Sequence, residues 1–409
     1  MTDPTLSLRR RQLLAGGAGA IAGSGLIGLA GEAVAQGAAS AASAPAGPRP
    51  LPGYVAWKNA DAVIVHNPNE LETKRSAFGT SAITSSDHLY VRNNVAPPDA
   101  SILADRGGWQ VGFEGVRTPR TLSVAELKTI GVETVATVLQ CSGNGRAFFP
   151  HKPSGAKWTV GASGCVIWSG VPVRYVVEAL GGAAPDVRYL TGTGGETFPA
   201  GIDPLTVMVE RSLPIEAMGD AILAWEMNGE PMSLAHGGPL RLIVPGYQGV
   251  NNVKYIKRVA LTANESQAAI QKTRYRLNGI GTQPSTADPS VLGMTVKSFV
   301  TSPSGGEPVK AGVVYVTGVA FSGGTPIKRV EISSDGGKTW VDAPFIGPDL
   351  GRFAWRQFAM PLRMSAGNYV VTSRATDSSG RVQPEQRSEN AGGYANTSWA
   401  DHAVKVVVV

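Results

Sequence analysis

The residues best suited to chemistry lie at 139–146 (LQCSGNGR), where one of only two cysteines follows an apolar run and precedes a glycine-rich turn. Arg146 closes this stretch. A nearby cation favours the thiolate form of Cys141, and a thiolate is either a nucleophile or a soft metal ligand. The role of Cys141 therefore decides the class of function.

Three roles are open to Cys141. A protease-like nucleophile needs a histidine base, and none of the five histidines has a spacing that assigns it this task. An oxidising compartment would favour a disulfide with Cys165, but Cys165 lies in a stretch typical of core packing (161–168, GASGCVIW). The third role is that of a metal ligand. Motifs for zinc (CxxC, HExxH), for covalent haem (CxxCH) and for a dinucleotide fold (GxGxxG opening a helix) do not occur.

Three further clusters place polar or charged residues beside turns, at 90–94 (YVRNN), 236–241 (HGGPLR) and 250–254 (VNNVK). Each of them alone is more often a solvated loop than a site. Together they offer histidine, arginine, lysine and backbone amides, which are the donor types that hold phosphate.

These clusters must be positioned by a globular chain of 409 residues, 43% hydrophobic and 17% charged. That length predicts two domains, and 51 glycines and 28 prolines favour short strands and many turns. Over 54–288, β-rich runs (134–139, 240–244) are mixed with helical patterns (124–128, 175–180), which predicts an α+β domain. The net charge of +6 comes without a dense basic run, so no nucleic-acid partner is expected.

The pattern changes from residue 289 onward. Short β-branched runs, such as 313–316, 329–332 and 369–371, are separated by Gly, Pro and Asp. The stretch 335–337 (DGG) is a hairpin signal. Frequent turns without a helical period predict an immunoglobulin-like antiparallel β-sandwich over 289–409.

Residues 1–35 are expected to be a targeting segment. Three arginines (Arg9, Arg10 and Arg11) precede a charge-free stretch (13–31) and a small-residue cleavage pattern (33–35). An uncleaved membrane anchor is the alternative, but the stretch is only mildly apolar. Residues 36–53 are rich in Ala, Gly, Ser and Pro and are interpreted as a flexible arm. We therefore expect twin-arginine export to the periplasm and no stable membrane span.

The ordered motifs resemble the sulfite oxidase family of molybdenum enzymes, and the resemblance covers nearly the whole chain after the targeting segment. It implies a mixed α/β molybdopterin-binding domain followed by a dimerisation sandwich. It also implies a molybdenum–molybdopterin cofactor, with no haem in this chain. The motifs that carry it are 90–93 (YVRN), 141–146 (CSGNGR), 158–161 (WTVG), 224–231 (AWEMNGEP), 236–241 (HGGPLR), 253–255 (VKY) and 330–340 (VEISSDGGKTW).

The resemblance also implies a role for each site residue. Cys141 would be the thiolate ligand of the molybdenum, and a soft thiolate suits a centre already ligated by sulfur. Arg92 and Arg146 would hold an anionic substrate, because the rigid guanidinium matches an oxyanion. Tyr275 would couple proton movement to electron transfer. The pterin phosphate would be held by His236, Arg241, Lys254 and the backbone of Asn252 and Val253, with Tyr90, Asn93 and Asn94 as further cofactor contacts.

Some features depart from the family pattern. Asn94 stands where many members have a histidine, which alters one contact to the pterin. A substrate arginine of animal members has no match around 390–394 (NAGGY), which loosens the anion pocket. No cytochrome b5-like domain precedes the molybdenum domain, so electrons would leave to a separate acceptor, a c-type cytochrome.

The implied function is the oxidation of sulfite to sulfate by an exported dehydrogenase. Its oligomer would be a homodimer or a heterodimer with a cytochrome subunit. The alternative within the family is the sulfane dehydrogenase subunit of a thiosulfate-oxidising complex, and a methionine sulfoxide reductase ranks below because it has less need of Arg92 and Arg146. The alternative of another class is a non-catalytic periplasmic binding or adhesion protein, which predicts no metal.

Overall fold

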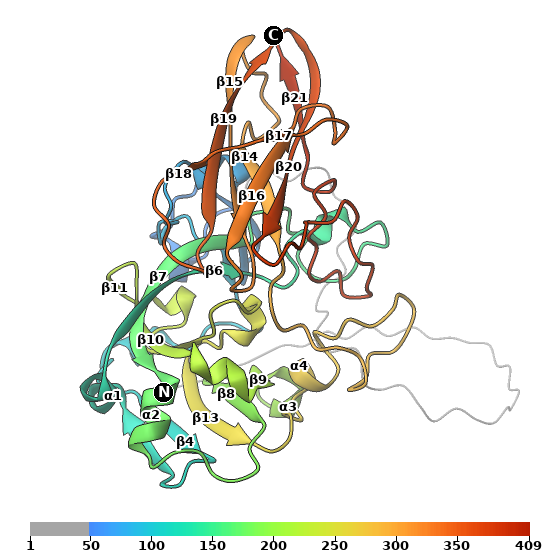
Figure 1. The fold of residues 1–409 in the computed structure, drawn as a ribbon. Helices are drawn as coiled ribbons and strands as arrows, with labels where there is room; N and C mark the ends of the chain where they lie inside the picture. The colour runs from blue at the N-terminus through green and yellow to red at the C-terminus, as the bar shows by residue number, and fades with distance from the viewer. Residues whose placement is uncertain (1–48) are drawn as a thin grey trace, which may run out of the picture. The chain divides into compact units, whose positions relative to one another are not determined.

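Strands dominate the fold, and its helices are short (Figure 1). The computed structural model describes residues 49–409. The targeting segment expected at 1–35 and most of the arm expected at 36–53 lie outside these residues. Among the helices of the described part, none is long and apolar enough to cross a membrane.

A small antiparallel sheet carries Tyr90, Arg92 and Asn93 to the site. Its strands follow the order β1-β2-β3, and Glu70 on β2 lies opposite Arg92 on β3. Leu71 is fully buried beneath this sheet and anchors it in a local apolar cluster. The bounds are β1 (Val63–Asn67), β2 (Glu70–Thr73) and β3 (Val91–Arg92).

A second sheet ends at the candidate reactive cysteine. β6 and β7 pair antiparallel, so that Gln140 lies opposite Ser163 and Cys141 follows directly. Val138 and Leu139 are both buried because alternate side chains of the strand enter two different apolar clusters. Packing on both faces holds the strand end from which Cys141 projects. The strands are β6 (Glu133–Gln140), β7 (Ser163–Pro172), β10 (Ile222–Met227), β11 (Glu230–Pro231) and β12 (Arg241–Ile243).

The third sheet is mixed, with β13 parallel to β4 and antiparallel to β8. It shares the largest apolar core with helices α1 and α2, which correspond to the predicted helical patterns. A capping box fixes the start of α1, where Ser123 and Glu126 exchange hydrogen bonds. The bounds are β4 (Gln110–Glu114), β5 (Arg120–Ser123), β8 (Tyr189–Gly194), β9 (Glu210–Pro214), β13 (Ile256–Thr262), α1 (Val124–Ile130), α2 (Val173–Ala179), α3 (Pro204–Val207) and α4 (Ala269–Lys272).

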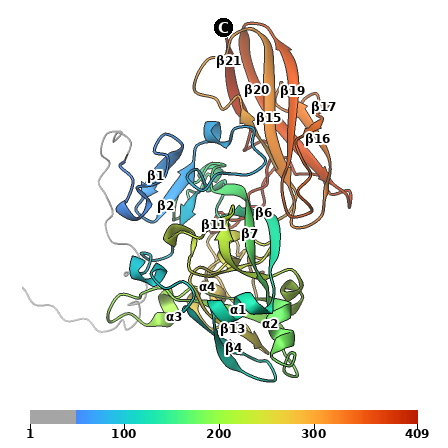
Figure 2. The same ribbon diagram turned by 90° about the vertical axis from the view of Figure 1, so that its left-hand side faces the viewer.

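Two four-stranded antiparallel sheets form the C-terminal domain (Figure 2), which confirms the predicted sandwich and the α+β class. Val316 and Val371 are fully buried in the core of this domain. The turn predicted at 335–337 joins two paired strands, with Ile332 opposite Val341. One sheet contains β14 (Lys297–Ser302), β15 (Gly312–Phe321), β18 (Phe345–Ile346) and β19 (Arg356–Met364), and the other contains β16 (Ile327–Ser333), β17 (Val341–Asp342), β20 (Gly367–Asp377) and β21 (Val404–Val408).

Residues 390–396, here called the C-terminal segment, lie against the turn 141–146, here called the cysteine turn. The Ala395 N–H donates to the Ser142 carbonyl at 2.9 Å. In the other direction, Arg146 Nε donates to the Gly392 carbonyl at 3.0 Å. The two domains therefore meet at the candidate site.

Asn396 is the centre of this contact. Its Nδ2 donates to the Gly145 carbonyl at 3.1 Å and to Asp401 at 2.8 Å, while its own carbonyl accepts from the buried Lys297 at 3.0 Å. Gly145 has a φ of +88°, and a Cβ there would meet the Asn396 Cβ at 2.8 Å. The close approach of the two segments thus requires glycine at this position.

Candidate functional site

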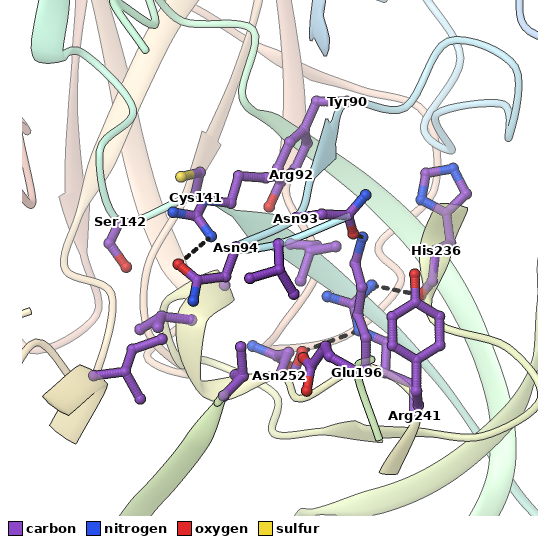
Figure 3. Close-up of a pocket in the computed structure, with 18 of the residues that line it drawn as sticks. Tyr90, Arg92, Asn93, Asn94, Cys141, Ser142, Glu196, His236, Arg241 and Asn252 are labelled. Carbon is purple, nitrogen blue, oxygen red and sulfur yellow. Dashed lines mark hydrogen bonds between the residues drawn. The ribbon is translucent and has the colours of Figure 1, made fainter. Parts of the chain in front are cut away.

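One pocket gathers nearly all of the predicted site residues (Figure 3). Its empty volume, which includes space open to solvent, is about 700 Å³. Of the predicted residues, only Arg146 and Val253 do not line it. The predicted residues that line it are Tyr90, Arg92, Asn93, Asn94, Cys141, His236, Arg241, Asn252, Lys254 and Tyr275.

Cys141 is a free and almost fully buried thiol at the end of β6. Its N–H donates to the Ala162 carbonyl at 2.8 Å, which fixes the backbone. Burial raises the pKa of the thiol, and the positive charges of Arg92 and Arg146 oppose this shift without cancelling it. The sequence suggested a thiolate favoured by Arg146 alone. In the metal-free chain burial outweighs the cations, so a bound metal must displace the thiol proton.

No protein side chain accompanies Cys141 as a second predicted metal ligand. Across residues 49–409, no group of three or more His, Cys, Asp or Glu side chains could hold a metal ion. In the resemblance stated above, the pterin cofactor would supply the other ligands of the metal. Cys165 is a separate free thiol, fully buried on β7.

Arg92 lies beside Cys141 on one side of the pocket (Figure 3). Asn94 positions its guanidinium, because the Asn94 side-chain oxygen accepts from Arg92 at 3.5 Å while its amide donates to the Val207 carbonyl at 2.7 Å. Glu70 lies 3.9 Å from Arg92 Nε and balances part of its charge. The asparagine that departs from the family pattern thus acts as a fixed contact of Arg92.

Arg146 is buried behind the cysteine turn and does not line the pocket. Its guanidinium lies under Gly143 and donates to the carbonyls of Gly392 and Ala156 at 3.0 Å and 3.4 Å. It also lies 5.2 Å from the ring centroid of Tyr394. The implied role of Arg146 in holding the substrate stays a prediction.

A set of two cations, the buried Arg241 and the half-buried Lys254, forms the opposite side of the pocket. Lys254 Nζ donates to Asn93 at 2.7 Å and to a backbone carbonyl. Arg241 donates to the carbonyls of Asn252 and His236 at 3.1 Å and 2.9 Å. Burial, followed by repulsion from the neighbouring arginines, holds the pKa of Lys254 well below its usual range. An anion bound here would relieve that repulsion.

His236 is oriented by Lys58, a residue that the sequence interpretation did not include. Lys58 Nζ donates to the carbonyls of Leu89 and Ser86 at 2.7 Å and 2.8 Å and lies 3.3 Å from His236 Nε2. The same nitrogen lies 3.4 Å from the Ser86 carbonyl, so Nε2 accepts from Lys58 when it is unprotonated and donates to Ser86 when it carries the proton. Burial and then the Lys58 charge hold the pKa of His236 well below its usual range, in keeping with a neutral ring.

Glu196 also lines the pocket and was missed from the sequence. It follows β8 in an irregular loop and has no motif around it that marks a site. One carboxylate oxygen is buried without a hydrogen-bond partner among the described residues. Burial raises its pKa to about 7, although Lys254 acts in the opposite direction. This acceptor fits a ligand that carries N–H donors.

Tyr275 lines the pocket, whereas Val253 lies in the apolar core and does not line the pocket. The Tyr275 backbone has a φ of +51°, and its ring stacks on Tyr394. The Val253 side chain is buried in the largest core, and its carbonyl accepts from Leu242 at 2.9 Å. The implied contact between the Val253 backbone and a phosphate stays a prediction.

The residues fit the molybdenum–molybdopterin cofactor that the resemblance implies. Figure 3 shows Cys141 on one side of the pocket and His236 with Arg241 on the other. A thiol suits the metal, and cations suit the phosphate. The unpaired oxygen of Glu196 supplies an acceptor for the pterin ring.

Comparison with known families identifies two domains in the chain. Residues 98–270 match the oxidoreductase molybdopterin binding domain. Residues 288–408 match the Mo-co oxidoreductase dimerisation domain. The first match contains Cys141 and the cation set, and the second contains the C-terminal segment.

The chain is similar to sulfite oxidases. It is 30% identical to the sulfite oxidase of Arabidopsis thaliana, over 82% of this chain and 92% of the relative. It is 31% identical to that of Gallus gallus, over 78% of this chain and 72% of the relative. In structure it resembles the sulfane dehydrogenase SoxCD from Paracoccus pantotrophus, with a TM-score of 0.71, 24% identity and coverage of 84% of this chain and 88% of that one.

Replacing Glu196 with glutamine should change how the stability of the cofactor-free chain depends on pH. A carboxyl whose pKa is about 7 in the folded state and about 4.5 otherwise binds its proton more tightly when folded. The wild type therefore loses stability as the pH rises between these values, and the variant does not. We expect the Glu196→Gln chain to gain up to about 3 kcal/mol over the wild type at pH 7.5, and much less at pH 4.5.

Urea unfolding at both pH values measures this difference. Glu307→Gln, at an exposed position, is the matched control and should show no such trend. A Glu196→Gln chain whose free energy of unfolding follows the wild type at both pH values would contradict the burial argument.

Proposed function

Because this chain belongs to the sulfite oxidase family of molybdenum enzymes, we propose that it oxidises sulfite to sulfate and passes the electrons to a c-type cytochrome. It is an oxidoreductase of sulfur compounds that uses the molybdenum–molybdopterin cofactor. The observation that carries the proposal is the placement of Cys141, Arg92 and the cation set around one pocket. A non-catalytic binding protein would have no use for this arrangement.

Different residues of the chain would hold the metal and the phosphate of the cofactor. Cys141 would ligate the metal, while His236, Arg241 and Lys254 would hold the phosphate. When bound, the molybdenum centre supplies the two-electron redox chemistry. The reaction converts sulfite and water into sulfate, two protons and two electrons.

Arg92 is the residue best placed to bind the substrate. Sulfite is an anion at neutral pH, so it needs a cation beside the metal. Asn94 and Glu70 hold the guanidinium of Arg92 toward Cys141 before substrate arrives, which reduces the cost of ordering it. The phenol of Tyr275 lines the same pocket and is a candidate for moving a proton as electrons leave.

The partners are proposed from the domain composition. The chain carries the family's dimerisation domain, which supports a dimer. A homodimer that meets a soluble cytochrome and a heterodimer with a cytochrome subunit are both compatible with it.

Sulfane dehydrogenation is the second candidate function. The match in fold to the sulfane dehydrogenase SoxCD favours it, because it covers most of both chains. The two candidates need different substrates. Free sulfite requires only a small anion site, whereas carrier-bound sulfur requires access for a carrier arm.

Protein purified from a host that makes molybdopterin should contain about one molybdenum per chain and should reduce cytochrome c when sulfite is added. Elemental analysis and steady-state turnover measure these quantities. Turnover only in the presence of a sulfur carrier would replace the first candidate with the second. Absence of molybdenum would exclude both.

Replacing Cys141 with serine should abolish sulfite oxidation, since a hydroxyl is a poor ligand for a soft site. The fold and the bound pterin should largely remain, because the cation set is untouched. Turnover, circular dichroism and the fluorescence of released pterin measure the three quantities. Cys165→Ala is the matched control and should keep its activity. A Cys141→Ser variant that retains turnover would refute the ligand assignment.

We further propose that the protein acts in the periplasm after twin-arginine export. The basic start with Arg9, Arg10 and Arg11, followed by a charge-free stretch, supports this. Changing all three to lysine should leave the precursor in the cytoplasm, as measured by cell fractionation and immunoblotting. Arg49→Lys is the control. Export of the triple variant at the wild-type level would contradict the proposed route.

A further inference from the structure

Lys58 is a buried cation that the proposed function does not use. It is only 4% exposed, and it follows the short helix η1 (Gly53–Val55). Lysine is almost never buried this deeply unless it is paired. Within residues 49–409, however, Lys58 forms no salt bridge, and its ammonium contacts two backbone carbonyls and the ring of His236. The burial of Lys58 therefore depends on these three contacts.

The three contacts of Lys58 match the donors of an ammonium. Its Nζ donates to the carbonyls of Ser86 and Leu89 at 2.8 Å and 2.7 Å, and it lies 3.3 Å from His236 Nε2. An ammonium has three N–H donors and no acceptor. The charged form of Lys58 can thus serve all three partners, provided that His236 Nε2 carries no proton.

The Ser86 carbonyl competes with Lys58 for His236 Nε2. It lies 3.4 Å from that nitrogen, and it already accepts from Lys58 at the shorter distance of 2.8 Å. With Lys58 charged, Nε2 accepts its hydrogen bond and the proton of the neutral ring is on Nδ1. Without Lys58, Nε2 would instead keep the proton and donate to Ser86, which would leave Nδ1 with a lone pair.

Nδ1 is the nitrogen of His236 that is left for a ligand. His236 lines the pocket, whereas Lys58 and Ser86 do not. Among residues 49–409, both hydrogen bonds of the ring involve Nε2. Trp57 packs edge-on against the same ring, with centroids 6.0 Å apart, and restrains its orientation. A phosphate oxygen accepts a hydrogen bond from an N–H and is repelled by a lone pair, so the location of this one proton matters.

We propose that Lys58 is a positioning residue for the cofactor phosphate, because it donates to His236 Nε2 and so presents the Nδ1–H of His236 to the phosphate. The inference rests on the cofactor of the proposed function and deepens it, since it adds a residue that acts on the phosphate from behind the pocket wall. Burial lowers the pKa of Lys58 to about 7. A phosphate held by His236, Arg241 and Lys254 brings negative charge to this region and favours the charged form of Lys58.

A purely structural role is the competing explanation. Lys58 also fixes the backbone of Ser86 and Leu89, which leads into the pocket residue Tyr90. If this were its only task, losing the ammonium would weaken the fold and leave the proton of His236 where it is. The position of that proton and the coupling between Lys58 and His236 separate the two explanations.

The first test locates the proton in the full-length, cofactor-free chain. In Lys58→Met the side chain keeps its length and loses its donors. Nitrogen-15 NMR of labelled histidine at about pH 6 distinguishes the two tautomers, and His236→Gln identifies the signals of His236. We expect the Nδ1–H form in the wild type and in Lys310→Met, an exposed control, and the Nε2–H form in Lys58→Met. The same tautomer in Lys58→Met as in the wild type, or the Nε2–H form in the wild type, would overturn the proposal.

The second test measures how fast the loaded protein loses molybdopterin, followed by the fluorescence of the released pterin. Lys58→Met should lose it about tenfold faster than the wild type, the change that corresponds to one hydrogen bond to a charged group. In a His236→Ala background the same substitution should change the rate by less than about twofold, because residues that act through one contact are not additive. Equal effects in both backgrounds would show that Lys58 acts on the fold alone.

The failure of the proposed function gives a different result. A wild type that retains molybdopterin but does not oxidise sulfite would overturn the proposed function, and the rate of pterin loss would still decide the role of Lys58. A wild type that binds no molybdopterin would also overturn the proposed function. The histidine tautomers, which are measured without cofactor, would then decide whether Lys58 sets the proton of His236.

Discussion

Positive charge buried around one pocket is the constraint on which the rest of the structure depends. Arg241 donates to the Asn252 carbonyl and Lys254 donates to the Asn93 side chain, so their hydrogen bonds go to neutral acceptors rather than to carboxylates. Among the residues that line the pocket, Glu196 is the one carboxylate. Burying cations without a carboxylate partner is costly, so a bound anion would stabilise this part of the folded chain. The short strands, the tight turns and the Lys58 support of His236 all serve to keep these donors in place.

The sequence predicted the parts of this arrangement that leave a periodic or local mark. The strand before Cys141 and the helical pattern that became α2 depend on apolar spacing, and both are present. The β-sandwich was predicted from the regularly spaced turn residues after residue 289. The site residues were found through motifs, and ten of those predicted converge on one pocket because the folded sheets bring their loops together.

The residues that the sequence did not reveal act through tertiary contacts. Lys58 and Glu196 have no motif around them, and their importance appears only when distant segments meet. The effect of burial on the Cys141 thiol was also hidden, because the proximity of Arg146 in sequence suggested a cation-stabilised thiolate. In the structure, the Arg146 guanidinium instead donates hydrogen bonds to the carbonyls of Gly392 and Ala156.

The contact between the cysteine turn and the C-terminal segment has a consequence for biosynthesis. In sequence, 246 residues separate Arg146 from Gly392, which its guanidinium contacts. A ribosome adds residues from the N-terminus onward, so the contacts between the cysteine turn and the C-terminal segment form only after the sandwich has been synthesised. A chain that ends before residue 390 would therefore lack the contacts that support the cysteine turn from behind.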